Sequence, residues 1–202
     1  MSGLLTPQDL FAKLRLQWLS DYLYEDITLK EQIQAEFKGI FDSSEKALAY
    51  KWNGIYYKKH ILNNASAPLE ARWLGPEIGY GLFALSFLPS QSFIGTYLGK
   101  IRRKSPFNNA FINSYSFTFP IQPGHWLKGW GWGWTIDALM QGNHTRFINH
   151  GDKGNCESTG AICQNQIYII IRAKRDIQAG EQILYDYGQG YWSKRDSPHL
   201  LQ

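Results

Sequence analysis

The chain reads Arg146-Phe147-Ile148-Asn149-His150 at its most informative point, and farther on it reads Gly180-Glu181-Gln182-Ile183-Leu184-Tyr185-Asp186-Tyr187-Gly188. Asn149 and His150 end an apolar segment with side chains that can both donate and accept hydrogen bonds. Tyr185 and Tyr187 are two residues apart, so their rings fall on one face if the segment is a strand. Polar ligand groups in one segment and paired phenols in another predict a site that holds a polar cofactor beside an aromatic channel.

Further short motifs surround these two stretches in a fixed order. They are Gly79-Tyr80-Gly81-Leu82-Phe83-Ala84, Phe93-Ile94-Gly95-Thr96-Tyr97-Leu98-Gly99, Tyr115-Ser116-Phe117, Thr135-Ile136-Asp137-Ala138, Gly142-Asn143, Asn155-Cys156 and Asp176-Ile177. Each motif alone is a weak signal. Taken in order, from about residue 72 to residue 192, they make the chain resemble the SET-domain family of protein-lysine methyltransferases.

The resemblance implies an α+β fold, the SET-domain fold, with small curved β-sheets and a knot-like C-terminal segment. In that fold the Asn149-His150 segment passes beneath a loop formed by the C-terminal strand, which brings Asn149 close to Tyr187. We expect an N-terminal helical region over residues 1–65 and a SET domain over 70–192. Within the SET domain we expect a variable insert over 100–134, and a tail follows over 193–202.

The resemblance also implies S-adenosylmethionine as cofactor, with S-adenosylhomocysteine as product, and no metal. The protein must bind this cofactor, align a neutral lysine amine with its methyl group and exclude water. Tyr187 matches the catalytic tyrosine of the family, and Tyr97 and Tyr185 match positions that line the lysine channel. Tyrosine at position 185 implies mono-methylation with some di-methylation.

Cofactor contacts of the family match a second set of residues in this chain. Trp192 would cover the adenine ring in place of the cysteine-rich zinc segment of many family members. The chain has Gly151 where members usually have serine, so we expect a looser loop after His150 and an effect on cofactor affinity. The matching residues are Gly79, Tyr80, Gly81, Asn113, Tyr115, Arg146, Phe147, Asn149 and His150.

Composition is compatible with this family and excludes other classes. Of 202 residues, 44% are hydrophobic, which suffices for a packed core. The longest apolar run, Ile167–Ile171, is too short to span a bilayer, so no membrane partner is expected. Two cysteines, Cys156 and Cys163, indicate a reducing compartment. We expect the cytoplasm or the nucleus, and a host nucleus if the protein is a secreted bacterial effector.

Charge is uneven along the chain: residues 1–70 carry 8 basic and 9 acidic side chains, and residues 71–202 carry 13 and 8. Lys100-Ile101-Arg102-Arg103-Lys104 is the densest basic cluster. We interpret it as a solvated loop in preference to a site for nucleic-acid phosphates, so direct nucleic-acid binding is not expected. A basic substrate would then need acidic groups from Asp137, Glu157 or the N-terminal carboxylates.

The N-terminal residues follow helical patterns. Thr6-Pro7-Gln8-Asp9 is typical of a helix start, and Leu10, Leu14, Trp18 and Tyr22 recur as one apolar stripe of a helix. Thr28-Leu29-Lys30-Glu31 predicts a capping box for a second helix, and a third runs from Ser44 to about His60. Residues 63–68 are the expected linker. We expect these helices to pack on the catalytic domain and cover its surface.

Tryptophan alternates with glycine inside the variable insert, at Trp126, Trp130, Trp132 and Trp134. Sheet packing is favoured over an aromatic platform for substrate, although either use fits alternation with a period of two. An exposed tryptophan-rich strand would also be one route to a homodimer.

Two functions of different classes follow from these observations. The first is a protein-lysine N-methyltransferase whose partner is a protein substrate, a histone or histone-like protein being favoured. The second is a non-catalytic SET-like module that binds a partner protein. Retention of Tyr187 together with Asn149 and His150 favours the enzyme, because a scaffold has no need of them.

Overall fold

Most of the helices lie in the first third of the chain and most of the strands follow them, as is typical of an α+β fold. The computed structural model describes residues 5–40, 45–104, 113–122 and 133–192, without the side chains of residues 38–40, 45, 46, 190 and 192. In these ranges no helix has the length and apolar character needed to cross a membrane. The helices are α1 (Pro7–Lys13), α2 (Ile27–Ile40), α3 (Glu45–Tyr56), α4 (Lys58–Leu62), the 3-10 helix η1 (His144–Phe147) and α6 (Gln189–Trp192). The strands are β1 (Gln17–Trp18), β2 (Leu23–Tyr24), β3 (Leu69–Trp73), β4 (Tyr80–Ala84), β5 (Phe93–Thr96), β6 (Lys100–Lys104), β7 (Ser116–Thr118), β8 (Gly133–Asp137), β9 (Gln141–Gly142), β10 (Asn149–His150), β11 (Cys156–Cys163), β12 (Gln166–Ala173) and β13 (Leu184–Tyr185).

The largest sheet has the strand order β10-β13-β11-β12-β5. Strand β13 runs parallel to both of its neighbours: His150 of β10 pairs with Tyr185, and Cys156 of β11 pairs with the same residue. The C-terminal strand therefore occupies the space between two segments that precede it in the chain. This insertion confirms the adjacency of the Asn149-His150 segment and the tyrosine segment.

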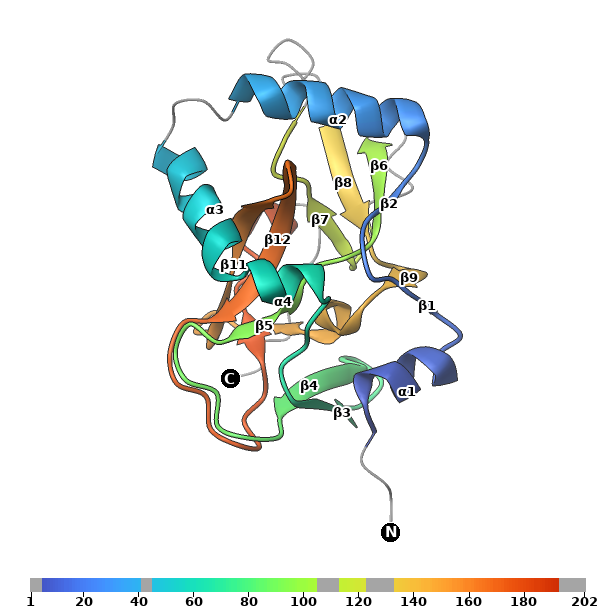
Figure 1. Ribbon diagram of the computed structural model, residues 1–202. Coiled ribbons are helices and arrows are strands. Elements are labelled where there is room, and N and C mark those ends of the chain that lie inside the picture. The colour runs from blue at the N-terminus through green and yellow to red at the C-terminus, as the bar shows by residue number, and fades with distance from the viewer. Residues whose placement is uncertain (1–4, 41–44, 105–112, 123–132, 193–202) are drawn as a thin grey trace.

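Smaller sheets surround this one, and the N-terminal region joins two of them. Strand β1 pairs in parallel with β9, and β2 extends the sheet β2-β6-β8-β7, while β3 and β4 form an antiparallel pair. Two apolar clusters fill the interior, and N-terminal side chains belong to both: Leu29 and Tyr57 to one, Leu10 and Phe11 to the other. The N-terminal region is thus part of the same packed body (Figure 1).

Helix α1 is shorter than its apolar stripe predicted. Thr6 caps it as expected, with a reciprocal capping box to Asp9 and Pro7 in the first turn. The helix ends at Lys13 because Arg15 adopts a left-handed conformation, with φ 55°. Trp18 therefore lies on β1, and the single helix predicted through Tyr22 is wrong.

The next two helices begin close to their predicted positions. The cap of α2 is Asp26, whose Oδ1 accepts from the Leu29 amide at 2.7 Å, so the capping box predicted at Thr28 is wrong. Helix α3 lies along β11, as Figure 1 shows, and Gly54 faces the Ile162 backbone so closely that a Cβ would overlap it. The predicted third helix is divided between α3 and α4, and residues 63–68 carry no helix or strand. These helices cover the sheet, as expected.

The basic cluster forms a strand, and the loop predicted for it is wrong. Residues 100–104 are β6, which pairs with β8 over its whole length. Arg103 forms ion pairs with Glu25 and Asp26, and Arg102 pairs with Asp137. Internal carboxylates thus neutralise both arginines, which leaves less charge for phosphates. The expected insert over 100–134 begins in β6 and ends in β8, two neighbouring strands of one sheet. Trp126, Trp130 and Trp132 lie outside the described residues, and Trp134 is buried, 5% exposed.

Candidate functional site

Insertion of β13 brings the two signature stretches into contact. The Tyr187 amide donates to Nδ1 of His150 at 3.2 Å, and the Tyr187 hydroxyl donates to the Ile148 carbonyl at 2.7 Å. The rings of Tyr185 and Tyr187 lie 4.9 Å apart between centroids, although only Tyr185 belongs to the strand. The predicted pairing of the phenols is confirmed.

The bond pattern of His150 fixes its tautomer. Because Nδ1 accepts from Tyr187, the ring proton resides on Nε2, which donates to Asp152 Oδ1 at 3.0 Å. The ring centroid lies 5.3 Å from that of Tyr187. His150 therefore holds the segment that carries Tyr187 in place. Asn149 holds strand β4 close to this segment, since its Nδ2 donates to the Tyr80 carbonyl at 3.2 Å.

A cavity of about 270 Å³ lies over the tyrosines. Tyr97, Tyr185, Tyr187 and Tyr191 line it, together with Trp134 and other residues. Burial raises the pKa of Tyr97, Tyr185 and Tyr187 above its ordinary value, so all three phenols remain neutral at physiological pH. Among the described lining residues there is no carboxylate, and the charged ones are Lys104 and Arg146.

A larger cavity, of about 600 Å³, adjoins the first one. Both are lined by Ser114, Arg146, Tyr187 and Tyr191, so these residues mark where the two cavities meet. The predicted cofactor residues that line the larger cavity are Gly79, Tyr80, Tyr115, Arg146, Phe147, Asn149 and His150. Most of the predicted cofactor residues therefore line the same cavity.

Gly81 and Asn113 take supporting positions instead. A Cβ at Gly81 would lie 3.1 Å from Nδ2 of Asn149 and 2.7 Å from Nε2 of Gln182, so glycine lets these side chains approach the β4 backbone. Asn113 lines neither cavity; its Oδ1 accepts from the Tyr115 amide at 2.8 Å. The structure does not describe the side chain of Trp192, so its predicted contact with the adenine ring stays a prediction.

Arg146 lies at the junction with its guanidinium buried, 7% exposed. Its Nε donates to the Ala138 carbonyl at 2.7 Å and its Nη2 to the Leu139 carbonyl at 2.9 Å. The guanidinium carbon lies 3.9 Å from the centroid of the Tyr115 ring, in a cation–π arrangement. Tyr115 in turn accepts the Tyr97 hydroxyl on its carbonyl at 2.8 Å. Arg146 thereby connects residues of both cavities.

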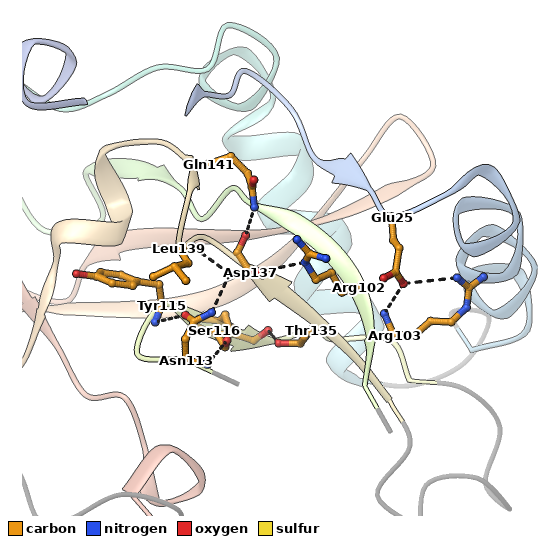
Figure 2. Close-up of polar contacts among 11 residues, drawn as sticks. Glu25, Arg102, Arg103, Asn113, Tyr115, Ser116, Thr135, Asp137, Leu139 and Gln141 are labelled. Atoms are coloured by element: carbon orange, nitrogen blue, oxygen red, sulfur yellow. Dashed lines mark hydrogen bonds and ion pairs between the residues drawn. The ribbon is translucent and has the colours of Figure 1, made fainter. Parts of the chain in front are cut away.

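Asp137 lines neither cavity but organises this framework, and Figure 2 shows its polar contacts. Its carboxylate accepts from Asn113 Nδ2 at 2.9 Å and from the Leu139 amide at 3.0 Å, and it forms an ion pair with Arg102 at 3.1 Å. Glu157 is likewise engaged, with Arg172 at 2.9 Å. Asp137 and Glu157 line neither cavity, and Glu25 and Asp26 pair with Arg103. The acidic contribution of these carboxylates to a groove for a basic substrate therefore stays a prediction.

Many residues that line the cavities were not predicted from the sequence, among them three from the larger cavity and one that lines both. Leu14, Leu16 and Trp73 line the larger cavity, and Tyr191 lines both. The first three lie outside every family motif, and their spacing carries no signal of a site. Tyr191 was visible only as an aromatic neighbour of Trp192.

The larger cavity fits S-adenosylmethionine in size and in the chemistry of its lining. Its volume lies within the usual range for small-molecule sites, roughly 300–1,000 Å³. Asn149, His150 and the Gly79-Tyr80 backbone offer polar contacts, while Leu14, Leu16 and Trp73 offer apolar surface. A nucleoside joined to an amino acid requires both kinds of contact.

Small sheets with an inserted C-terminal strand, and two cavities that meet at a tyrosine, define the class of the protein. The family model described as "SET domain" matches residues 79–188, and the chain belongs to the SET-domain family. The chain is 35% identical over 161 residues to the "Putative histone-lysine N-methyltransferase 1" of Plasmodium falciparum, covering 74% of this chain and 2% of that protein. It is 31% identical over 145 residues to the putative histone-lysine N-methyltransferase ASHH4 of Arabidopsis thaliana, covering 72% and 39%.

Solved structures agree on the fold. ATXR5 in complex with histone H3.1 mono-methylated on R26 matches with a TM-score of 0.62 and 17% identity, over 91% of this chain and 86% of that one. The Chaetomium thermophilum polycomb repressive complex 2 contains a chain that matches with a TM-score of 0.51 and 25% identity, over 70% of this chain and 17% of that one. The chain thus spans less than a tenth of the length of the first curated relatives it matches, for example 8% and 2% of two of them.

Proposed function

We propose that the protein is a lysine N-methyltransferase that transfers a methyl group from S-adenosylmethionine to a lysine of a histone or histone-like protein. The observation that carries the proposal is the junction of two cavities at Tyr187, one lined by phenols and the other by the Asn149-His150 segment. The cofactor would occupy the larger cavity and the lysine side chain the smaller one. The cofactor supplies an electrophilic methyl group when bound.

Tyr187 would orient the lysine amine. Its hydroxyl proton is committed to the Ile148 carbonyl, so the oxygen lone pairs are available to accept an amine N–H. A phenol whose pKa is raised above its ordinary value is a poor base at neutral pH. Tyr187 therefore serves as a positioning acceptor, and the lysine proton leaves to solvent.

The smaller cavity would favour the neutral amine. Burial in an aromatic channel lowers the pKa of a lysine, and the nearby Arg146 and Lys104 cations add to this effect. A carboxylate would have the opposite effect, and none is found in the described lining. The substrate would therefore bind better as its lysine loses its proton.

The remaining parts of the proposal concern product, substrate and location. Tyr185, which is buried, supports mono-methylation, with some di-methylation, because its hydroxyl would hold a water where further methyl groups would go. A histone substrate is supported by the names of the relatives, which are histone-lysine methyltransferases. The free thiols of Cys156 and Cys163 support a reducing compartment, the cytoplasm or the nucleus.

The test is transfer of labelled methyl from S-adenosylmethionine to a panel of histones and small basic proteins. Wild type should label a lysine, and Tyr187→Phe should lower kcat by about 100-fold or more. The matched control is Tyr56→Phe, at a tyrosine that is 72% exposed on α3, and it should leave kcat unchanged. Failure of wild type both to label and to bind S-adenosylhomocysteine would reject the enzyme in favour of a non-catalytic binding module.

A further inference from the structure

The larger cavity has a wall that the family match does not include. Leu14 and Leu16 follow α1, and Trp73 ends β3, so all three precede residues 79–188. We propose that the segment Lys13–Leu16 and Trp73 together form the surface that holds the adenine ring of the cofactor. This inference rests on the proposed function, and it gives the N-terminal region a role in cofactor binding.

Residues of the cavity itself hold the segment in place. Phe11, 2% exposed, packs edge-to-face on Phe147 with centroids 5.6 Å apart. Lys13 Nζ donates to the Tyr80 hydroxyl at 3.0 Å. Phe147 and Tyr80 both line the larger cavity, so the position of α1 is tied to the walls that carry the family motifs.

The other end of the segment is anchored to the framework near Arg146. The Gln17 amide donates to the Met140 carbonyl at 3.0 Å, and β1 pairs with β9. Residues 14–16 thus bridge two fixed points, and they cannot move away from the cavity without breaking one of them.

The chemistry of this wall suits a purine. Leu14 and Trp73 are 39% and 58% exposed, and a flat aromatic ring placed against them would cover that apolar surface. Leu14, Leu16 and Trp73 line the larger cavity but not the smaller one. They therefore contact a part of the ligand other than the group presented to Tyr187, and the adenine is the apolar part that remains.

The test measures binding of S-adenosylhomocysteine by calorimetry, without any turnover. Leu14→Asp and Leu16→Asp should each raise Kd by about tenfold, because each replaces apolar contact with a carboxylate. The matched control is Leu48→Asp, at a leucine that is 57% exposed on α3 and lines neither cavity. It should bind like wild type. Circular dichroism of each variant verifies the fold.

Hydrogen exchange provides a second readout on the wild-type chain. The amides of Leu14 and Leu16 donate to the carbonyls of Leu10 and Phe11, both at 3.0 Å. Saturating S-adenosylhomocysteine should slow their exchange, while that of α3 should stay constant. An unchanged Kd in both aspartate variants would reject the proposal that this segment holds the adenine ring, and the proposed function would remain. Absence of binding to wild type would instead reject both.

Discussion

Tyr185 lines the smaller cavity beside Tyr187, and under the proposed function its hydroxyl limits the number of methyl groups that fit on the lysine. We predict that Tyr185→Phe shifts the product from mono-methyl towards di- and tri-methyl lysine. Mass spectrometry of a substrate peptide over a time course measures this shift. Tyr56→Phe serves as control, and an unchanged product distribution in Tyr185→Phe would contradict the role of the hydroxyl in limiting methylation.

Asp137 offers a second prediction at the scale of one residue, since its buried charge supports Arg102, Asn113 and the turn that holds Arg146. Asp137→Asn removes the buried negative charge that pairs with Arg102, so we expect a loss of about 3 kcal/mol in the free energy of unfolding. Urea unfolding measures the loss.

The matched control for Asp137 is an exposed ion pair. Asp26 is 46% exposed, and Asp26→Asn weakens its ion pair with Arg103. Asparagine can still cap α2. Asp26→Asn should cost much less than Asp137→Asn, because solvent screens an exposed ion pair. Equal losses in both variants would contradict the central role of Asp137 in the framework.

Individual site residues were predictable where a motif carried them. Tyr97, Tyr185, Tyr187, Asn149 and His150 all lie at the cavities because motif order reports on topology. The sequence shows the charge of the carboxylates but not their partners, and the structure pairs Asp137 and Glu157 with arginines.

Among the elements, α3 depends on close contact with β11. A Cβ at Gly54 would overlap the Ile162 carbonyl oxygen. Helix propensity alone favours Gly→Ala by about 1 kcal/mol. We nevertheless predict that Gly54→Ala destabilises the protein by about 2 kcal/mol, because the helix must move off the strand.

Thermal and urea unfolding show whether Gly54→Ala lowers or raises the free energy of unfolding. Ala49→Gly, at an exposed position of the same helix, provides the comparison and should cost about 1 kcal/mol from propensity alone. A gain in stability for Gly54→Ala would show that α3 does not need its close approach to β11.

Element prediction succeeded where local signals decide and failed where pairing decides. The cap at Thr6 was correct because it is a local hydrogen-bond pattern. The helix through Tyr22 was wrong because β1 pairs with β9, a partner remote in sequence. Residues 100–104 were taken for a loop for the same reason, since β2 and β8 enclose them.

Stability of the whole molecule should depend on pH through His144. This residue is 1% exposed, Nε2 lies 2.9 Å from the Ile94 carbonyl, and Nδ1 has no hydrogen-bond partner among the described residues. Burial lowers the pKa of His144 to about 4, below its unfolded value near 6.5. The folded state therefore binds fewer protons, so stability is complete above about pH 6.5 and falls as pH drops towards 4.

The expected loss over that window is about 3 kcal/mol, from a pKa difference of between two and three units. His144→Gln keeps an N–H donor but cannot titrate, so its unfolding free energy should change less between pH 6.5 and 4. Urea unfolding across this range measures both proteins. Parallel curves for the two proteins would contradict the assignment. The hydrogen bond from Arg175 lowers the pKa of Glu181 to about 2, so the stability that Glu181 contributes is lost only as pH falls below about 4.5.

Placement of β13 between β10 and β11 has a consequence for biosynthesis. The strand and Tyr187 are made after both of their neighbours, and until they arrive His150 has no tyrosine to hold and β10 has no partner within the described sheet. A nascent chain that has emerged only as far as β12 therefore lacks Tyr185, Tyr187 and the junction between the cavities. Under the proposed function, methyl transfer would begin only after β13 has emerged from the ribosome, and a shorter nascent chain would not modify a bystander protein.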